Sequence, residues 1–510
     1  MPNLNNFITR SCEKSKIVLN IVAVLAGFTT YFCMYSYRKP FAAGTYEGYS
    51  LWGVQFKILG ISLQIIGYTI SKFTGIKIVS EITPKYRGIC IISFLTTSEI
   101  VLILFGAIPR PYNCLVMLLN GLPLGQIWGL TFSYLEGRKT SALLGSGMGI
   151  SFIVASGAVK SVGQTLLMKG INQFWMPAAV GGIFYIPMIL AVLVLESIPP
   201  PDAEDIACRA ERVVMENKDR SRFCKVFGPG VICMIIFNMF LVAYRDFRDN
   251  FAPELWEAFG YGGVPSIFSI SEIIVAFIVC IPFGIFMLIK TPINTLIAYH
   301  VLIIGGSLLI GLCGLLNNSG KMPGLYFMIV SGVGLYLGYV PFNSIIFDAL
   351  IAAFHYRANS GFLSYVCDSM GYLSSVVILF VKNFGSADLS WLQFFRILSY
   401  TIALVAVFFL TLAILFCVWK YKHWDPLQFE NENENVEYDI IKIKKLGKNG
   451  LTSETEETKT DNTLEENYTE DDIDERSQSV DDNEDISVSM SRSNSSSSIK
   501  ETDKNRIDTV

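Results

Sequence analysis

Long apolar segments separated by short polar ones recur along the first 420 residues of the chain. The hydrocarbon core of a bilayer is about 30 Å thick, so a helix that spans it needs about 20 mainly apolar residues. Twelve segments meet this requirement: 17–41, 52–78, 88–108, 112–134, 141–167, 174–196, 228–252, 264–289, 292–314, 323–346, 360–383 and 392–419. The pattern therefore predicts an all-α membrane protein with twelve transmembrane helices.

The twelve segments are arranged as six and six around a polar stretch. This stretch begins with Pro199-Pro200-Pro201 and continues with interspersed basic and acidic residues. The organisation predicts an N-terminal six-helix bundle (1–196), a cytoplasmic linker (197–227) and a C-terminal six-helix bundle (228–420). The remaining residues, 421–510, hold too few apolar side chains to offset the entropy of ordering, and we predict a disordered acidic tail.

The charge composition changes at the same boundary. The chain is 16% charged, whereas soluble proteins typically contain about 25% charged residues. Residues 421–510 contain 24 acidic and 11 basic side chains, and subtracting these from 44 and 40 leaves 20 acidic and 29 basic in residues 1–420. This composition excludes a soluble enzyme, a collagen-like fibre and a wholly disordered chain. The tail is the segment expected to contact a cytoplasmic partner, if one exists.

The loops differ in their content of Lys and Arg. With Met1 in the cytoplasm, one set of loops contains most of the basic residues, including those of the 197–227 linker. Basic loops remain on the cytoplasmic side of membranes, so both termini are predicted to be cytoplasmic. The first apolar segment is longer than the core of a signal peptide, so we expect a multi-pass protein of the bilayer.

Motifs for enzymatic chemistry are missing from the sequence. It contains no His-Glu-x-x-His, no Gly-x-Ser-x-Gly and no phosphate loop that ends in Gly-Lys-Ser/Thr. Its three histidines, His300, His355 and His423, are too scattered for a metal site, and basic stretches interleaved with aromatic residues are absent. We therefore expect no enzyme activity, no cofactor, no metal and no nucleic-acid partner.

Several charged residues interrupt the apolar segments. A charge near the bilayer centre costs roughly 2.5–3.5 kcal/mol on insertion scales, so each is a functional candidate. The basic candidates for substrate binding are Arg38, Lys72, Lys160, Arg245 and Arg248, and the acidic candidates for coupling or ion pairing are Glu99, Asp246, Asp249 and Glu272. We interpret Asp246 and Asp249 as counter-ions of the neighbouring cations. Lys39 and Lys57 either face the bundle or extend to the outer interface.

Arg38 and Arg245 are the strongest candidates, one in each half. A guanidinium group stays charged and therefore needs a partner in the bundle or a bound anion. Each guanidinium group presents parallel N–H donors in one plane, so two such groups can bind the oxygens of one phosphate or carboxylate group. A bound anion would screen the repulsion between the two arginines, whereas in the empty site this repulsion would oppose closure of the halves. The protein would therefore change sides readily only with an anion bound, which predicts exchange of small anionic substrates.

The two halves contain similar segments at nearly constant offsets. The matching pairs are Tyr37–Ala42 with Phe247–Ala252 and Gly53-Val54 with Gly263-Val264, at offset 210, and Gly121–Gly125 with Gly334–Gly338, at offset 213. Two related six-helix halves are the layout of the major facilitator transporters. In such folds the substrate lies near the midplane between the repeats, which rock around it.

Segments of three predicted helices resemble one family of that superfamily, the organophosphate:phosphate antiporters. The segments Gly27–Tyr31 and Tyr37–Ala42 resemble its first helix, Ser71-Lys72-Phe73 with Gly75 resembles its second, and Asn238, Phe240, Arg245 and Pro253 resemble its seventh. The resemblance implies exchange of an organic phosphate for phosphate, with Arg38, Lys72 and Arg245 as substrate ligands.

The chain also departs from that family. The family's fifth-helix histidine has no counterpart, and Lys160 or Ser156 is the candidate to replace it. Arg248 is an additional arginine and an alternative to Arg245 as the ligand.

Two other functions remain open from the sequence. A proton-coupled symporter would use Glu99, Glu272 or Asp368 and would show pH-driven uptake without a counter-anion. A non-transporting membrane receptor or scaffold would act through the acidic tail. Deletion of residues 430–510 would abolish the role of a scaffold, whereas a transporter would keep its flux.

Overall fold

The structure is a computed structural model and describes residues 2–424, apart from 136–137, 139, 203–204, 206–216, 287, 290, 355, 357, 359 and 387. The described residues belong to one compact unit, Met1–Glu430. The predicted disordered tail, 421–510, lies outside the described residues from residue 425 onward. Residues 203–204 and 206–216 of the predicted linker also lie outside the described residues.

The first half of the described chain is helical apart from a two-stranded hairpin. Its elements are α1 (Pro2–Lys14), α2 (Lys16–Arg38), a 3-10 turn (Pro40–Ala43), β1 (Ser50–Leu51), β2 (Val54–Gln55), α3 (Phe56–Glu81), a 3-10 turn (Pro84–Tyr86), α4 (Arg87–Ala107), a 3-10 turn (Tyr112–Leu115), α5 (Val116–Leu124), α6 (Ile127–Phe132), α7 (Ser141–Met168) and α8 (Met176–Glu196). The strands are antiparallel, with Ser50 opposite Gln55 and Leu51 opposite Val54. Ser15 caps α2, because its side chain accepts a hydrogen bond from the backbone N–H of Val18.

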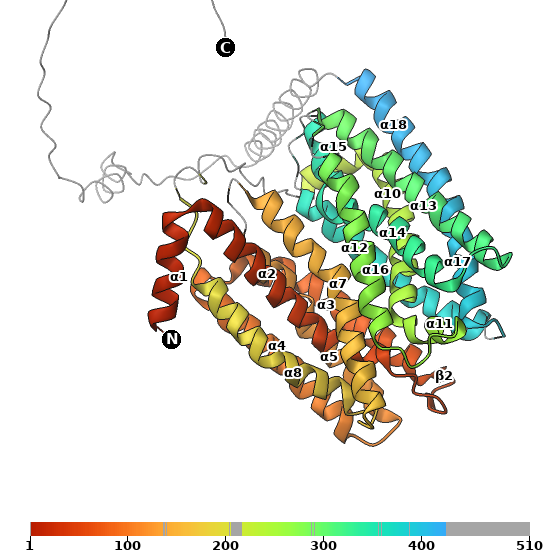
Figure 1. Ribbon diagram of the computed structural model, residues 1–510. Coiled ribbons are helices and arrows are strands. Elements are labelled where there is room, and N and C mark those ends of the chain that lie inside the picture. Colours follow the sequence, from red (N-terminus) through yellow and green to blue (C-terminus); the bar gives the residue numbers. More distant parts are fainter. Residues whose placement is uncertain are drawn as a thin grey trace, which may run out of the picture. The chain divides into compact units, whose positions relative to one another are not determined.

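The described part of the second half consists of helices. They are α10 (Asn217–Asn250), α11 (Ala252–Ala258), α12 (Ser266–Phe286), α13 (Pro292–Asn318), α14 (Gly324–Ser344), α15 (Ile346–Phe354), α16 (Ser360–Phe380), a π-helical turn (Val381–Gly385), α17 (Trp391–Val405), a second π-helical turn (Ala406–Leu410) and α18 (Thr411–Lys422). The beginning of α2 and the end of α18 lie toward the same side of this unit (Figure 1).

The predicted membrane segments coincide with these helices. Eleven helical stretches among the described residues are long and apolar enough to cross a membrane, and each overlaps one predicted segment. The remaining predicted segment, 52–78, corresponds to α3, whose 26 residues extend about 39 Å at 1.5 Å per residue. The prediction of an all-α membrane fold is confirmed.

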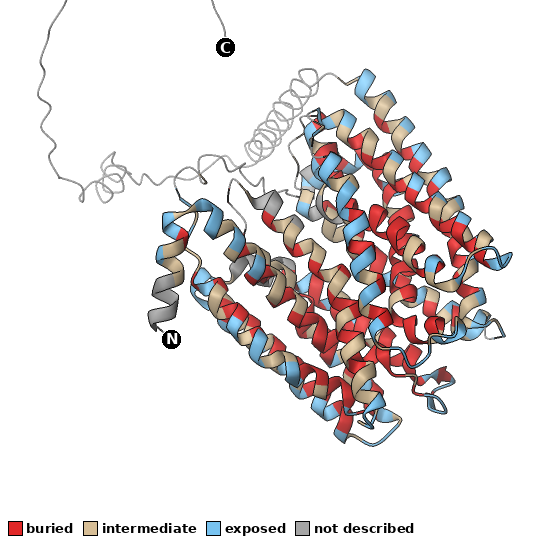
Figure 2. Ribbon diagram, viewed as in Figure 1, coloured by how far each residue is buried: buried red, intermediate tan, exposed pale blue. Residues whose placement is uncertain are grey.

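Burial follows the expectation for helices that contact lipid. Buried residues lie along the inner faces of the helices and exposed residues along their outer faces (Figure 2). Large apolar side chains are exposed there, among them Ile17 at 72%, Phe277 at 73% and Leu404 at 72%. In water such surfaces would be costly, so they indicate the faces that contact acyl chains.

The sequence repeat has a counterpart in local geometry. Gly53 and Gly263, which match at offset 210, both have a φ of 75°, a conformation that favours glycine. The helix before each glycine ends in the matching segment: α2 ends at Arg38 and α10 at Asn250. A short helical turn then follows in both halves.

The most extensive helix contacts between the two halves are α3 with α16 and α7 with α12. Within the first half, α2 packs on α7 and α8, and α3 packs on α5. Within the second half, α10 packs on α16 and α13 on α14. The helices of the two halves diverge toward the side that carries α1 and the end of α18 (Figure 1).

The α3–α5 contact depends on Gly121. A Cβ atom at this position would collide with the backbone carbonyl oxygen of Gln64 and come within 2.8 Å of the backbone nitrogen of Tyr68. We expect Gly121→Ala to push α3 away, at a cost of about 1–3 kcal/mol, and to lower the melting temperature of the purified protein. Gly284→Ala is the matched control, because its Cβ meets nothing within 4 Å. Equal melting temperatures for the two variants would contradict this close approach of α3 and α5.

Candidate functional site

Arg38 lies at the end of α2 and points into the interior between the halves. Its side chain is 5% exposed, and its guanidinium carbon, Cζ, lies 4.2 Å from the ring centre of Tyr68 and 5.5 Å from that of Tyr372. Its backbone carbonyl accepts a hydrogen bond from Gln64 Nε2 at 3.2 Å. Among the described residues, no carboxylate forms an ion pair with this guanidinium group.

Arg245 reaches the same region from α10 in the other half. Its Nε and Nη2 atoms donate to a single oxygen, Asp246 Oδ1, at 3.0 and 2.7 Å. Its Cζ lies 4.2 Å from the ring centre of Tyr339 and 5.3 Å from that of Tyr372. Because both arginines contact Tyr372, their Cζ atoms are at most the sum of the two distances, 10.8 Å, apart. This bound places both guanidinium groups at one site between the halves.

Three buried tyrosines, Tyr68, Tyr339 and Tyr372, surround these arginines, and we call them the tyrosine cluster. Tyr68 on α3 and Tyr372 on α16 pack edge to face across the two halves, with ring centres 5.1 Å apart. Each cation–π contact contributes about 0.5–2 kcal/mol. Such contacts stabilise a guanidinium group without neutralising it, so the rings hold Arg38 in place while its charge stays available to an anion.

A small polar cavity lies between the halves at this point. Its free volume is about 20 Å³, and it is lined by Tyr35, Arg38, Lys39, Phe152, Arg245, Asp246, Asp249, Tyr336 and Tyr339. The lining therefore comes from α2, the following Lys39 and α7 on one side and from α10 and α14 on the other. This volume holds about one water molecule. An organic anion is larger, so its entry requires the halves to move.

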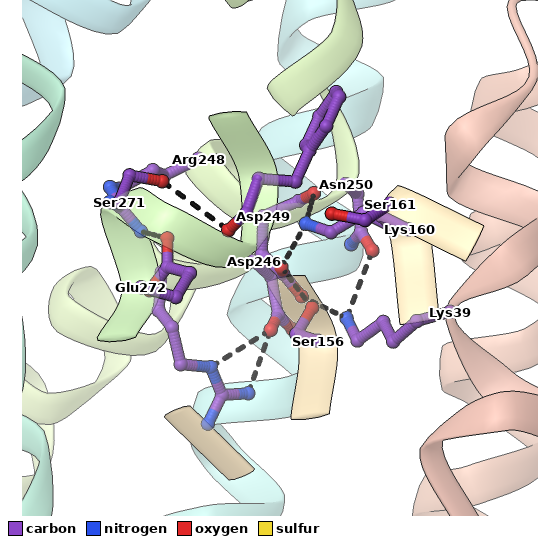
Figure 3. A network of polar contacts seen from close by, with 12 residues as sticks. Lys39, Ser156, Lys160, Ser161, Asp246, Arg248, Asp249, Asn250, Ser271 and Glu272 are labelled. Carbon is purple, nitrogen blue, oxygen red and sulfur yellow. Dashed lines mark hydrogen bonds and ion pairs between the residues drawn. The ribbon is translucent and has the colours of Figure 1, made fainter. Parts of the chain in front are cut away.

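Asp249 of α10 joins the two halves through contacts with Lys39 and Lys160 (Figure 3). Its Oδ2 lies 2.5 Å from Lys39 Nζ, and its Oδ1 lies 2.5 Å from Lys160 Nζ. Ser156 donates to the same Oδ1 at 2.5 Å, and Lys39 also donates to Asn250 Oδ1 at 3.1 Å. The alternative that Lys39 extends to the outer interface is wrong. Its ammonium group is instead held by a carboxylate of the other half.

A second ion pair across the halves lies closer to the hairpin. Lys57 at the start of α3 pairs with Glu254 of α11 at 2.5 Å, and its side chain is 5% exposed. Nearby, Asn383 Oδ1 accepts from the backbone N–H of Gln55 at 3.1 Å. Lys57 therefore does not extend to the interface either. The alternative that Lys57 extends to the outer interface is therefore wrong, as it is for Lys39.

Lys72 pairs with Asp368 between α3 and α16. The distance from Lys72 Nζ to Asp368 Oδ2 is 2.5 Å. The same ammonium group lies 5.2 Å from the ring centre of Tyr372. Lys72 is thus adjacent to the tyrosine cluster but does not line the cavity.

Arg248 occupies a different environment from Arg245, although the two residues are three positions apart on one helix. Its Nη1 donates to Glu272 Oε1 of α12 at 2.8 Å, and its Nη2 donates to the carbonyl oxygen of Met328 at 2.9 Å (Figure 3). Arg248 does not line the cavity. Its alternative role as a replacement for Arg245 has no support in this conformation.

Glu99 lies apart from all these groups. It is on α4, and its carboxyl group lies against Gly181 of α8. Its Oε2 is buried and has no hydrogen-bond partner in the described part of the chain. The predicted site residues therefore fall into a cavity group (Arg38, Arg245, Asp246 and Asp249), flanking pairs (Lys72, Lys160, Arg248 and Glu272) and the separate Glu99.

The central groups carry a surplus of positive charge. Six cations lie here, Arg38, Lys39, Lys72, Lys160, Arg245 and Arg248, together with four carboxylates, Asp246, Asp249, Glu272 and Asp368. The surplus is two charges. In a low-dielectric interior such a surplus favours a bound anion.

Sequence reasoning missed the tyrosine cluster and the placement of Lys39. A signal for the tyrosines was present, because Tyr68 lies four residues before Lys72 and Tyr372 four residues after Asp368. Residues four apart share a helix face. No group of three or more His, Cys, Asp or Glu residues within the described ranges is arranged to hold a metal ion.

Solved structures with a similar fold are membrane transporters. They include a D-xylose-proton symporter (TM-score 0.55, 14% identity, 78% of this chain and 98% of that chain). A bacterial homologue of the human lysosomal transporter Spinster, in an inward-facing and unoccupied conformation, has a TM-score of 0.53 and 12% identity over 80% of this chain and 98% of that chain. A point mutant of the nucleoside transporter NupG has a TM-score of 0.51 and 16% identity over 78% of this chain and 99% of that chain. The chain therefore has the fold of the major facilitator transporters.

Sequence comparison gives the family. Residues 40–420 match the model of DUF5690, described as a family of unknown function, and the chain belongs to this family. No curated protein matches the sequence significantly. Membership of the organophosphate:phosphate antiporter family, which the helix segments resemble, is not confirmed by these comparisons.

Proposed function

We propose that the protein is a secondary transporter that moves a small organic anion by alternating access, with the anion held between Arg38 and Arg245. The observation that carries this proposal is the Arg38 guanidinium group, which has no ion-pair partner in the described part of the chain and lines a cavity between the halves. A buried arginine cannot lose its proton to avoid the cost of burial. A substrate anion supplies the missing counter-charge.

The charge surplus favours a doubly charged group. A phosphate monoester carries close to two negative charges at neutral pH, which matches the surplus of two in the central groups. Arginine forks also suit the tetrahedral oxygens of phosphate. We therefore infer that the cargo is an organic phosphate, exchanged for phosphate, as the resemblance of the first, second and seventh helices implies.

The polar contacts between the halves support a state closed on one side. The Asp249 contacts, the Lys57–Glu254 pair and the Gln55–Asn383 hydrogen bond lie near the ends of the helices that lead to the 40–55 and 250–265 loops. On the predicted topology this is the outer side. Opening it breaks these contacts, and a bound anion drives the switch only by binding one state better than another.

The experiment is a counterflow measurement with purified protein in liposomes. Uptake of radiolabelled phosphate is expected to require phosphate or an organic phosphate inside the vesicles and to be inhibited by sugar phosphates but not by neutral sugars. Protein-free vesicles give the background. Uptake of a neutral sugar without a counter-anion would contradict the proposal.

A proton-coupled symporter is the second candidate, and one observation favours it. Glu99 Oε2 and Glu272 Oε2 are buried carboxyl oxygens without hydrogen-bond partners among the described residues, as proton-carrying groups would be. In the same vesicles, this function predicts uptake driven by a pH gradient and its loss in Glu99→Gln or Glu272→Gln. Deletion of residues 430–510 distinguishes both transporters from a scaffold, because a transporter should keep its flux whereas a scaffold should lose its role.

A further inference from the structure

One carboxylate oxygen of Asp246, which lines the cavity, accepts no hydrogen bond from the described residues. The residue is 2% exposed and lines the cavity. Arg245 donates both of its hydrogen bonds to Oδ1, and Oδ2 is buried with no hydrogen-bond partner among the described residues. A buried acceptor without a partner is destabilising, so such groups call for an explanation.

The other carboxylate of the cavity is fully engaged. Asp249 Oδ1 receives Lys160 and Ser156, and its Oδ2 receives Lys39. Asp246 Oδ2 is therefore the carboxylate oxygen that remains free in the described lining of the cavity. It lies on the same helix as Arg245, one residue along, so a ligand held by Arg245 is within its reach.

We propose that Asp246 selects, among the organic anions of the proposed function, those that also carry a hydroxyl group, and that Oδ2 accepts the hydroxyl hydrogen. This inference rests on the proposed function. A hydroxyl group is favoured over an ammonium group because the cavity already holds the cations Arg38, Lys39 and Arg245. A further positive charge at this point would reduce the attraction for the anion.

Two probes of similar size separate the effect of the hydroxyl groups. Glycerol 3-phosphate and propyl phosphate share the phosphate and the three-carbon chain, but propyl phosphate lacks the hydroxyls. We expect glycerol 3-phosphate to compete with radiolabelled phosphate exchange at least about tenfold better than propyl phosphate, because the analogue leaves Oδ2 unpaired. Equal inhibition by the two probes in the wild-type protein would overturn the inference, even if every Asp246 variant failed to fold.

The variant Asp246→Asn assigns the selectivity to this residue. The amide keeps the size and one acceptor for Arg245 but replaces Oδ2 with a donor. The ratio of the two inhibition constants is expected to fall to about one, mainly through weaker glycerol 3-phosphate binding. The matched control is Asp388→Asn, the same amide change at an exposed residue outside the cavity lining, which should retain the wild-type ratio. An unchanged ratio in Asp246→Asn would overturn the assignment.

A second probe pair tests the choice of hydroxyl over ammonium. Phosphoethanolamine is expected to inhibit no better than ethyl phosphate, and a clear preference for the amine would overturn the choice of hydroxyl. The outcomes also distinguish failure of this inference from failure of the proposed function on which it rests. Absence of any phosphate exchange contradicts the proposed function, whereas exchange without discrimination between the probes contradicts the role of Asp246 alone.

Discussion

Arg38→Ala is expected to weaken substrate binding about 10–100-fold and to reduce exchange at low substrate concentration to background. A hydrogen bond to a charged group contributes about 1.5–3 kcal/mol, which corresponds to this range. Arg38→Lys should not restore exchange, because an ammonium group lacks the planar, parallel N–H donors of a guanidinium group. The measurement is phosphate counterflow in liposomes with matched amounts of inserted protein.

Arg110→Ala is the control for this prediction. Arg110 also lies over an aromatic ring, with Cζ 4.1 Å from the ring centre of Phe174, but it lies in the loop after α4, away from the cavity. The substitution removes the same charge and should leave exchange close to the wild-type rate. Wild-type exchange by Arg38→Ala would show that the site is assigned wrongly.

Arg245→Ala should abolish exchange as well, with an added loss of stability. Its removal leaves the buried Asp246 carboxylate without its ion pair, and breaking a buried pair in this way typically costs about 3–5 kcal/mol. The double variant Arg245→Ala/Asp246→Asn removes both charges. We expect it to regain thermal stability but not transport, which separates binding from folding.

Asp249→Asn is expected to open the outer side of the protein. This carboxylate holds Lys39 and Lys160 at 2.5 Å each, and loss of its charge leaves two buried ammonium groups without a counter-ion. Because separating the halves rehydrates these groups, the equilibrium should shift toward the outward-open state. Exchange should fall, since the outer side no longer closes.

Spin labels at positions 52 and 384 report this opening. Trp52 and Phe384 are exposed, at 71% and 62%, and lie beside the Gln55–Asn383 contact between the halves. With the exposed Cys224 and Cys280 replaced, the distance between labels should increase in Asp249→Asn. Asp368→Asn is the matched control, because its lysine pair lies deeper along α3. An unchanged distance in Asp249→Asn would contradict its role as an outer closure.

The fold was predictable because it depends on local composition. Apolar segments of about 20 residues have few alternatives to a membrane helix, and the repeated Tyr37–Ala42 and Phe247–Ala252 segments indicated two related halves. α3 was predicted in the same way, although Lys57 and Lys72 make it less apolar. The explanation for both lysines is in the structure, since each pairs with a carboxylate of the other half.

The site was predictable only in part, for a physical reason. The cost of burying a guanidinium group identified Arg38 and Arg245, but the choice of partners depends on helix packing between residues about 200 positions apart. Lys39 and Asp249 form such a pair, and no local pattern indicates it. Likewise, Arg245 and Arg248 differ in role because Glu272 of α12 and the Met328 carbonyl lie next to Arg248.

The most direct measurement is the location of a bound anion. Arsenate has the shape and charge of phosphate and scatters X-rays anomalously, so crystals grown with it show its position without ambiguity. We predict an anomalous peak between the halves, within hydrogen-bond distance of the guanidinium groups of both Arg38 and Arg245. A protein that exchanges phosphate but shows its arsenate peak elsewhere, or against one of the two arginines alone, would contradict the account.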